Sequence, residues 1–378
     1  MIKNNFRKFL WPVFVILVIT NCVEPYQAPF SNTETNILVV DGFINTTTNS
    51  ALVRLSRSIA LSRPQQFPAE VKAAVSIESE DGVKYQLVEK SGGNYEITGL
   101  NLSAAKKYRL LILTQNGSQY QSDYINLNTS PILDAVSWTP EETGVTVRAD
   151  AHDPGGLVKY YKWNYAETWE YTSNYESVYK IVKNAAVTRK PEDAIFKCWN
   201  TELSSKILIA STSRLSEAVV SKFALTFLPV GTIKLSRKYS ILVQLRGVRE
   251  EEFNYWQQLQ KTNENLGGLF DPLPSQVAGN IHNSVDPSDV VLGYFSAAGM
   301  QEKRIFISYA ELPIYLHTVN RPLCLQDTLL AAEIKTHLSA LLISSYGSPT
   351  IIGYTTASNE CIDCRESGGT LTKPAFWK

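Results

Sequence analysis

The sequence predicts a mainly β protein built from two sandwich-like domains. Short apolar runs with an alternating pattern recur along the chain, and Asp-Gly, Asn-Gly and Pro-Gly turn signals separate them. One segment alone has clear helical periodicity. The 378 residues exceed one ordinary domain. Hydrophobic residues make up 44% and charged residues 19% of the chain, a balance typical of a globular protein with a real core.

The segment from residue 35 to residue 129 predicts an N-terminal β-sandwich domain. Asp81-Gly82 and Asn116-Gly117 indicate hairpin turns, because each dipeptide lies between alternating apolar residues. Further strands are expected at residues 37–44, 51–57, 95–100 and 120–127. Leu102 and Tyr108 also resemble the tyrosine corner of immunoglobulin-like sandwiches. Short strands at this regular spacing favour an antiparallel sandwich.

A domain boundary is expected near residues 128–132, where polar residues and a proline separate two patterned regions. Residues 130–378 predict a larger C-terminal domain that resembles a fibronectin-like or immunoglobulin-like sandwich. Its strands are expected at residues 135–138, 145–149, 160–171, 207–210, 223–228, 239–245, 290–295 and 304–308. The second domain is therefore also predicted to be rich in β structure.

One helix elaborates this second domain near residues 250–265. Phe253, Trp256 and Leu259 share one helical face, acidic residues begin the segment and Gly267-Gly268 ends it. Three other segments have less regular patterns. They are residues 171–198, a long hairpin or an ordered loop; residues 333–344, either helix or strand; and residues 361–378, a largely extended tail held by a disulfide.

The stretch from Tyr160 to Tyr171 predicts one long aromatic strand, with a bulge near residues 166 and 167. Strand side chains alternate between faces, so one face would carry Tyr161, Trp163, Tyr165, Glu167, Trp169 and Tyr171. Two interpretations stay open. The rings form the sandwich core, which is favoured, or part of the ladder stacks on a ligand or a partner. Candidate binding or interface aromatics are Trp163, Trp169, Tyr171, Trp199 and Trp256.

The first 21 residues predict a signal peptide. Lys3, Arg7 and Lys8 precede a short apolar run from Phe9 to Thr20, which has the proportions of a secretory signal. Cys22 follows this run, and a cysteine at this position resembles the lipidated residue of bacterial lipoproteins. Residues 22–34 would then be a lipidated tether. The alternative is a membrane anchor with an incidental cysteine.

Four cysteines remain in the expected mature chain: Cys198, Cys324, Cys361 and Cys364. An even number in an exported protein predicts two disulfides, and the sequence leaves all three pairings open. The Cys361-x-x-Cys364 spacing also occurs in zinc and redox sites. No second pair of this spacing accompanies it, which favours disulfides over a metal site.

The composition and motifs predict no catalytic residues, no cofactor and no metal site. Lys plus Arg and Asp plus Glu each number 36, so no net charge favours nucleic acid. The four histidines match no metal motif, although His282 in a Gly-Asn-Ile-His context is the most interesting of them. Glu167 and Glu170 flank Trp169, but on a regular strand they point to opposite faces, which disfavours paired acid/base chemistry.

The order of motifs resembles the domain-of-unknown-function family numbered 4249, a family of Bacteroidetes lipoproteins. The resemblance spans essentially the mature chain. Its pieces are residues 160–163, 167–170, 198–200, 239–243, 253–256, 270–272, 279–281, 292–295, 304–307, 361–365, 368–369 and 374–377. Each piece is short, and the specificity lies in their combination.

The resemblance implies a lipoprotein anchored in the outer membrane by the lipid on Cys22. Such proteins are typically encoded beside TonB-dependent outer-membrane transporters, so a transporter is the expected partner. The expected role is to capture substrate for the transporter or to cap it, and the ligand would be a peptide, a sugar or another nutrient. The alternatives are a structural subunit of an outer-membrane or secretion assembly and, less favoured, a hydrolase. The sequence leaves open which face of the outer membrane displays the protein.

Overall fold

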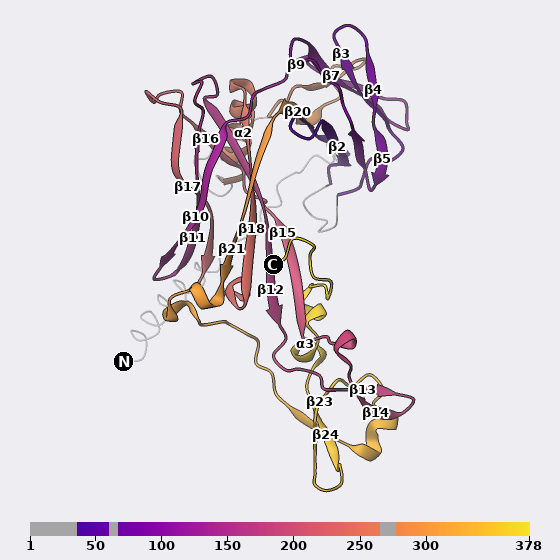
Figure 1. Ribbon diagram of the computed structural model, residues 1–378. Helices are drawn as coiled ribbons and strands as arrows, with labels where there is room; N and C mark the ends of the chain where they lie inside the picture. Colours follow the sequence, from indigo (N-terminus) through magenta and orange to yellow (C-terminus); the bar gives the residue numbers. More distant parts are fainter. Residues whose placement is uncertain (1–35, 60–66, 265–276) are drawn as a thin grey trace, which may run out of the picture.

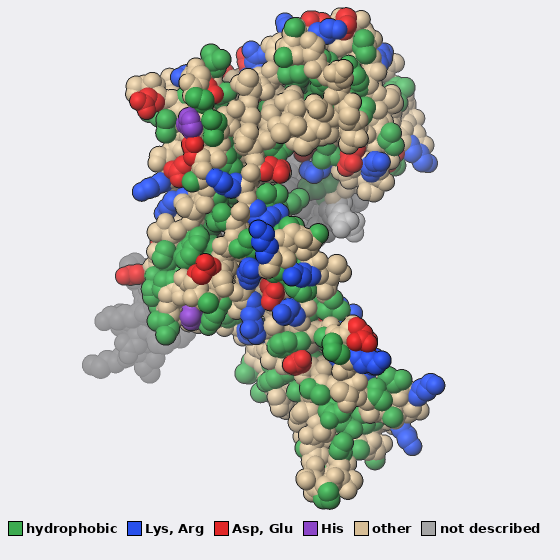
Figure 2. Space-filling view, viewed as in Figure 1, with side chains coloured by type: hydrophobic (Ala, Val, Ile, Leu, Met, Phe, Trp, Pro, Cys, Tyr) green, Lys and Arg blue, Asp and Glu red, His purple; other side chains and the backbone are tan. Residues whose placement is uncertain are grey.

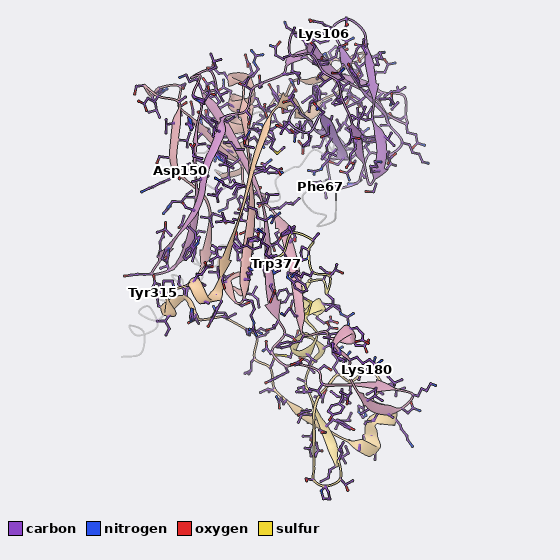
Figure 3. The ribbon with its side chains drawn as sticks, in the orientation of Figure 1. Phe67, Lys106, Asp150, Lys180, Tyr315 and Trp377 are labelled. Carbon is purple, nitrogen blue, oxygen red and sulfur yellow. A yellow bond between two sulfur atoms is a disulfide. The ribbon has the colours of Figure 1, made fainter. Side chains whose placement is uncertain are left out.

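The computed structural model describes residues 36–59, 67–264 and 277–378. Within these residues the chain is mainly β, with five sheets and one main helix, which confirms the predicted fold class. Cys22, the signal segment and the tether lie outside the described residues. Figure 1 shows sheets from the N-terminal part at one end, long strands in the middle and a small sheet at the other end. Lys106 and Lys180 lie at these two ends, with Trp377 between them (Figure 3).

Two sheets form the N-terminal sandwich. The first has the order β20-β1-β2-β6-β5, and the second has the order β19-β8-β7-β3-β4 with β9 paired to β7. Their bounds are β1 Leu38–Asn45, β2 Ser50–Arg57, β3 Ala74–Ser79, β4 Lys84–Gln86, β5 Val88–Ser91, β6 Asn94–Thr98, β7 Lys107–Leu113, β8 Gln119–Ser122, β9 Ile125–Asn126, β19 Ile281–Asn283 and β20 Val291–Ala298. Alternating residues of both sheets meet in one core between them.

The local signals read from the sequence hold in this sandwich. The Asp81-Gly82 turn joins β3 to β4, and the Asn116-Gly117 turn joins β7 to β8. The Tyr108 hydroxyl accepts a hydrogen bond from the Ser103 backbone N–H at 2.7 Å, as in a tyrosine corner. The predicted corner is therefore confirmed.

Two strands of this sandwich come from far along the chain. β20 pairs with β1 in parallel, and β19 pairs with β8. Phe295 of β20 is fully buried in the N-terminal core, and a Cβ at Gly42 would lie 2.8 Å from its ring. Asn280 fixes the backbone of Phe295, donating to its carbonyl and accepting from its N–H at 2.8 Å each. The division at residues 129 and 130 stays a prediction, but the later part of the chain completes the first core.

The middle of the molecule contains a sheet with the order β15-β12-β18-β21, with β16 also paired to β12, and a second sheet with the order β10-β11-β17. Their bounds are β10 Ile132–Glu141, β11 Gly144–His152, β12 Tyr160–Thr172, β15 Lys197–Leu203, β16 Leu208–Ser211, β17 Val219–Pro229, β18 Lys238–Val248 and β21 Met300–Ser308. β12 is one strand, as predicted. Its register with β18 is unbroken from residue 160 to residue 170, so the predicted bulge is wrong.

The predicted helix is confirmed as α2, Glu250–Glu264, with Phe253 buried against Tyr160 of β12. Short 3-10 segments connect other elements. They are η2 Pro191–Asp193, η3 Ile233–Leu235, η4 Tyr309–Glu311 and η5 Ile314–Leu316. Across the described residues, no helix has both the length and the apolar character that crossing a bilayer requires.

A small sheet at the far end has the order β14-β13-β23-β24-β22. Its strands are β13 Tyr179–Val182, β14 Ala185–Thr188, β22 Asp327–Leu330, β23 Leu342–Tyr346 and β24 Gly353–Thr356. The segment 171–198 therefore contains a hairpin. Residues 333–344 combine the two alternatives, with η6 Ala331–Thr336 followed by β23. The tail is less extended than predicted, because α3 Asn359–Ile362 and η7 Cys364–Ser367 form around its cysteines.

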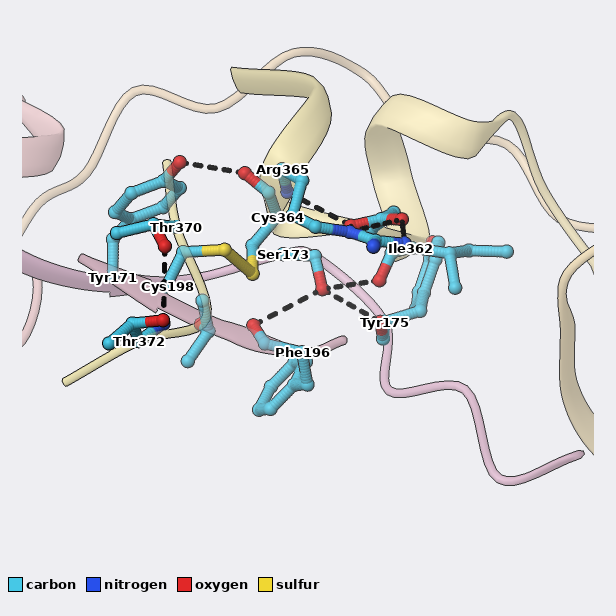
Figure 4. The surroundings of a disulfide bond; sticks show 12 residues. Tyr171, Ser173, Tyr175, Phe196, Cys198, Ile362, Cys364, Arg365, Thr370 and Thr372 are labelled. Atoms are coloured by element: carbon cyan, nitrogen blue, oxygen red, sulfur yellow. Dashed lines mark hydrogen bonds and ion pairs between the residues drawn. A yellow bond between two sulfur atoms is a disulfide. The ribbon is translucent and has the colours of Figure 1, made fainter. Parts of the chain in front are cut away.

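Both predicted disulfides are present. Cys198 pairs with Cys364, and Cys324 pairs with Cys361. The Cys198–Cys364 bond attaches the C-terminal tail to β15, where Cys198 lies opposite Tyr171 at the end of β12 (Figure 4). There the Tyr171 hydroxyl donates to the Cys364 carbonyl at 2.7 Å, and the Ser173 hydroxyl donates to the Ile362 carbonyl at 2.8 Å. The tail thus covers one end of β12.

Candidate functional site

The aromatic face of β12 forms the core of the middle region. Tyr161 and Trp163 are fully buried, Trp169 and Tyr171 are nearly so, and Trp163 stacks on Phe223 with 4.3 Å between ring centroids. Trp199 is also buried. The ladder is therefore part of the core, and the rings of Trp163, Trp169, Tyr171 and Trp199 leave little exposed surface for a ligand or a partner to contact.

Trp256 is the exception among the candidate aromatics. It is half-buried on α2 and lines a cavity of about 470 Å³ between the N-terminal sandwich and the middle sheet. This cavity lies against the opposite face of β12, where Lys162, Asn164 and Ala166 alternate. The other lining residues come from β1, β2, β18 and neighbouring segments: Asp41, Phe43, Leu52, Arg54, Tyr165, Leu203, Ser204, Gln244, Leu245, Arg246 and Met300. A volume of this order suits a small ligand.

Lys162 is the central charged group of this cavity. Its side chain is only 8% exposed, and its Nζ lies 4.1 Å from the centroid of the Trp256 ring. Nζ donates to Asn164 Oδ1 at 3.3 Å, and no carboxylate of the described residues forms an ion pair with it. Burial lowers the pKa of Lys162 to about 7, and the positive charge of Arg246 acts in the same direction. Glu252 and Asp41 oppose this shift from a distance.

A buried network holds Trp256 in place beside Lys162. Glu252 is 2% exposed, and one of its carboxylate oxygens accepts from Arg246 at 2.9 Å and from the Trp256 indole at 3.1 Å. Arg246 also donates to Ser296 Oγ at 2.7 Å and lies over the Phe43 ring. These contacts join β18, α2, β20 and β1, so the wall of the cavity is built from both regions of the molecule.

The rim of the cavity carries an exposed ion pair. Arg54 of β2 lies 3.6 Å from Asp41 of β1, and both side chains are more than half exposed. The N-terminal sandwich overhangs the middle sheet at this level, and Figure 2 shows Lys and Arg side chains gathered on the face below it. The cavity therefore has a charged, accessible rim and a buried interior.

The carboxylates flanking Trp169 do not form a catalytic pair. Glu167 is buried on the aromatic face and accepts from Lys234 at 2.8 Å and from the Tyr239 hydroxyl at 2.6 Å. Glu170 faces the other way and contacts Lys197 and Trp377. His282 lies on the surface, 3.2 Å from the Gln121 amide. Over the described ranges, no group of three or more His, Cys, Asp or Glu residues is placed to bind a metal.

The sequence prediction missed the cavity because the alternating aromatic residues of β12 indicate one face of the strand, whereas the cavity lies on the other face. The signal lay in the intervening positions, where Lys162 and Asn164 alternate with the aromatic residues of the first half of the strand. A polar pair in such a strand indicates either a solvated face or a site. Arg246 and Glu252 gave no signal of their own, since their partners are brought together only by the fold.

A family model described as "Domain of unknown function (DUF4249)" matches residues 23–304. No curated protein matches the chain. Among solved structures, one match is the chicken interferon gamma receptor alpha chain, with a TM-score of 0.14 and 8% sequence identity over 56% of this chain and 89% of that chain. With so low a TM-score, this likeness carries no structural or functional argument.

Proposed function

The chain belongs to the DUF4249 family, and we propose that it acts as a lipid-anchored accessory protein of the outer membrane. In this proposal the lipid on Cys22 attaches the mature chain to the membrane. The protein captures a peptide, a sugar or another nutrient for a TonB-dependent transporter, or caps that transporter. The role is one of binding rather than catalysis.

The cavity beside Lys162 is the observation that supports capture. A concave site of about 470 Å³ with an aromatic wall and a few polar groups is the usual form of a small-molecule site. A protein that served only as a scaffold would need a contact surface and no such cavity. The cavity therefore favours capture over a purely structural role.

A structural role in an outer-membrane or secretion assembly is the second candidate. Large apolar side chains are exposed near the far end of the molecule, with Leu323 and Leu325 more than two-thirds exposed and Ile352 more than half exposed. A continuous apolar patch at this end would favour contact with another protein. In the capture role, the same end would face the transporter.

A pull-down from the native outer membrane tests this proposal. The full chain carries a C-terminal tag, is solubilised in mild detergent, and its partners are identified by mass spectrometry. A TonB-dependent transporter recovered in stoichiometric amount is the expected result. Recovery of the chain alone, or with a secretion or assembly complex, would reject the accessory role. Cys22→Ala is the control, and we expect this variant to be lost from the membrane fraction.

A further inference from the structure

We infer that the cavity between the N-terminal sandwich and the middle sheet binds a small molecule with one carboxylate group, and that Lys162 is the charged contact of this carboxylate. The inference names the ligand class of the capture role, and it rests on the proposed function for the idea that the cavity receives cargo. It stands on the placement of Lys162, on the charges around it and on the shape of the wall.

Lys162 is a buried cation without an anion. Its ammonium group can donate three hydrogen bonds, and in the described residues Asn164 Oδ1 is the one side-chain acceptor it contacts, at 3.3 Å. Burying an ammonium group is costly unless it is paired. A ligand carboxylate placed in the cavity would supply the missing negative charge and two strong acceptors.

The other charged groups facing Lys162 are already engaged. Arg246 of β18 is paired with Glu252 of α2, and Arg54 of β2 is paired with Asp41 of β1 at the rim. Each pair is neutral, so the lining has one uncompensated positive charge. A single carboxylate matches this charge, whereas a phosphate would call for more cationic donors.

The remaining wall fits the body of such a ligand. The Trp256 ring is held by its indole bond to Glu252, so its face is a fixed surface beside the ammonium group of Lys162. Leu52, Leu203 and Met300 add apolar surface to the same cavity. Neutral polar groups of Ser204 and Gln244 provide further hydrogen-bonding capacity. The site thus combines one charged contact with a largely apolar body.

Protonation should control this binding. Lys162 titrates with a pKa of about 7, so the ammonium form dominates below this pH and the neutral amine above it. Since a carboxylate prefers the ammonium form, and the protonated fraction of Lys162 falls about thirtyfold between pH 6 and pH 8.5, the affinity should fall by up to about thirtyfold over this range.

Paired ligands test the inference on the purified full chain. Monocarboxylates with apolar, peptide and sugar bodies, such as 3-phenylpropanoate, N-acetyl-leucine and glucuronate, are each compared with the primary amide of the same body. Ligand-observed NMR at pH 6 reports binding and competition. We expect at least one carboxylate to bind about tenfold or more tightly than its amide. Lys162→Met should abolish that preference, and Lys107→Met on the exposed surface of β7 should preserve it.

Three results would overturn the inference: no carboxylate binds, acid and amide bind equally, or Lys162→Met retains the preference. The first two comparisons need no variant, so they hold even if the substitution disturbs the fold. Because no transporter is present, these outcomes are separate from those of the membrane pull-down. A cavity that prefers neutral ligands rejects the carboxylate and leaves capture intact, whereas a missing transporter rejects the accessory role and leaves the ligand class intact.

Discussion

Two lysine–tryptophan pairs lie on opposite faces of the middle sheet, and they differ in whether carboxylates form ion pairs with the lysine. Lys234 lies 4.7 Å from the Trp169 ring centroid and also binds Glu167 at 2.8 Å and Glu202 at 2.7 Å. Lys162 lies 4.1 Å from the Trp256 ring centroid and has no paired carboxylate among the described residues. The first pair is complete, and the second lacks an anion.

The pKa shifts of the two lysines follow this difference. Burial lowers the pKa of Lys234, but hydrogen bonds with Glu167 and Glu202 more than offset burial, so the pKa lies above its ordinary value. At Lys162, burial lowers the pKa to about 7 because no adjacent carboxylate compensates it. A lysine that keeps its own carboxylates, such as Lys234, is structural, whereas a buried lysine without them has room for a ligand's carboxylate.

The Cys198–Cys364 disulfide, beside the end of β12, should contribute more to stability than the Cys324–Cys361 disulfide. Replacing both Cys198 and Cys364 by serine removes a crosslink between residues that are 166 positions apart. In the chain-entropy description, this change should lower the unfolding free energy by about 5 kcal/mol. The matched change at Cys324 and Cys361, which close 37 residues, should cost about 4 kcal/mol. Denaturant titration followed by circular dichroism measures both. Equal stability of the wild type and the Cys198/Cys364 variant would contradict the role of this bond.

Lys162→Met should stabilise the folded protein at low pH. Below pH 7 the folded protein carries the full cost of the buried charge, and removing it should raise the unfolding free energy by roughly 5 kcal/mol. Between pH 7 and the ordinary lysine pKa of 10.5, the unfolded chain keeps a proton that the folded chain has lost, so wild-type stability rises with pH. The advantage of methionine should therefore shrink by about 2–3 kcal/mol from pH 7 to pH 9. A pH-independent difference would show that Lys162 does not titrate in this range.

Glu167→Gln should convert the complete pair into a partial one. The variant leaves the partly exposed Lys234 with Glu202, and losing its charged hydrogen bond to the buried Glu167 should cost about 2 kcal/mol of unfolding free energy. The pKa of Lys234 should fall toward that of a buried, unpaired lysine. Thermal unfolding at pH 7 measures the loss of stability, with Glu202→Gln at the more exposed carboxylate as the milder control.

Asn164→Asp should give the incomplete pair its own anion. Asn164 Oδ1 already lies 3.3 Å from the Lys162 ammonium, so an aspartate there should pair with it and raise the pKa of Lys162. The expected gain in unfolding free energy is about 1 kcal/mol. Carboxylate ligands should bind about tenfold more weakly, because the charge they would satisfy is already paired. NMR of the lysine side chains reports the pKa, and unchanged carboxylate affinity would contradict this assignment.

The sequence predicted the parts of the fold that depend on neighbouring residues. The Asp81-Gly82 turn, the corner at Tyr108, α2 and the long β12 all follow from local patterns, and all are present. The four cysteines were predicted to form two disulfides, but three pairings were equivalent in sequence. Only the fold brings Cys198 to Cys364 across a separation of 166 residues.

The candidate site was beyond sequence reasoning because its members come from distant segments. Lys162 meets Trp256 from α2, and the wall is closed by Asp41 and Arg54 from the other sandwich. No local pattern predicts that Arg246 forms an ion pair with Glu252. This pairing leaves Lys162 without a carboxylate partner. Trp256 was a candidate for its residue type alone, and its position in the cavity depends on tertiary contacts.

The return of β20 to the side of β1 has a consequence for how the protein is made. The first sandwich cannot close until residues 281–298 have been synthesised, although its other strands are complete by residue 126. Until β20 is in place, the edge of β1 and the space for Phe295 are open, so a strand from another chain could pair there instead.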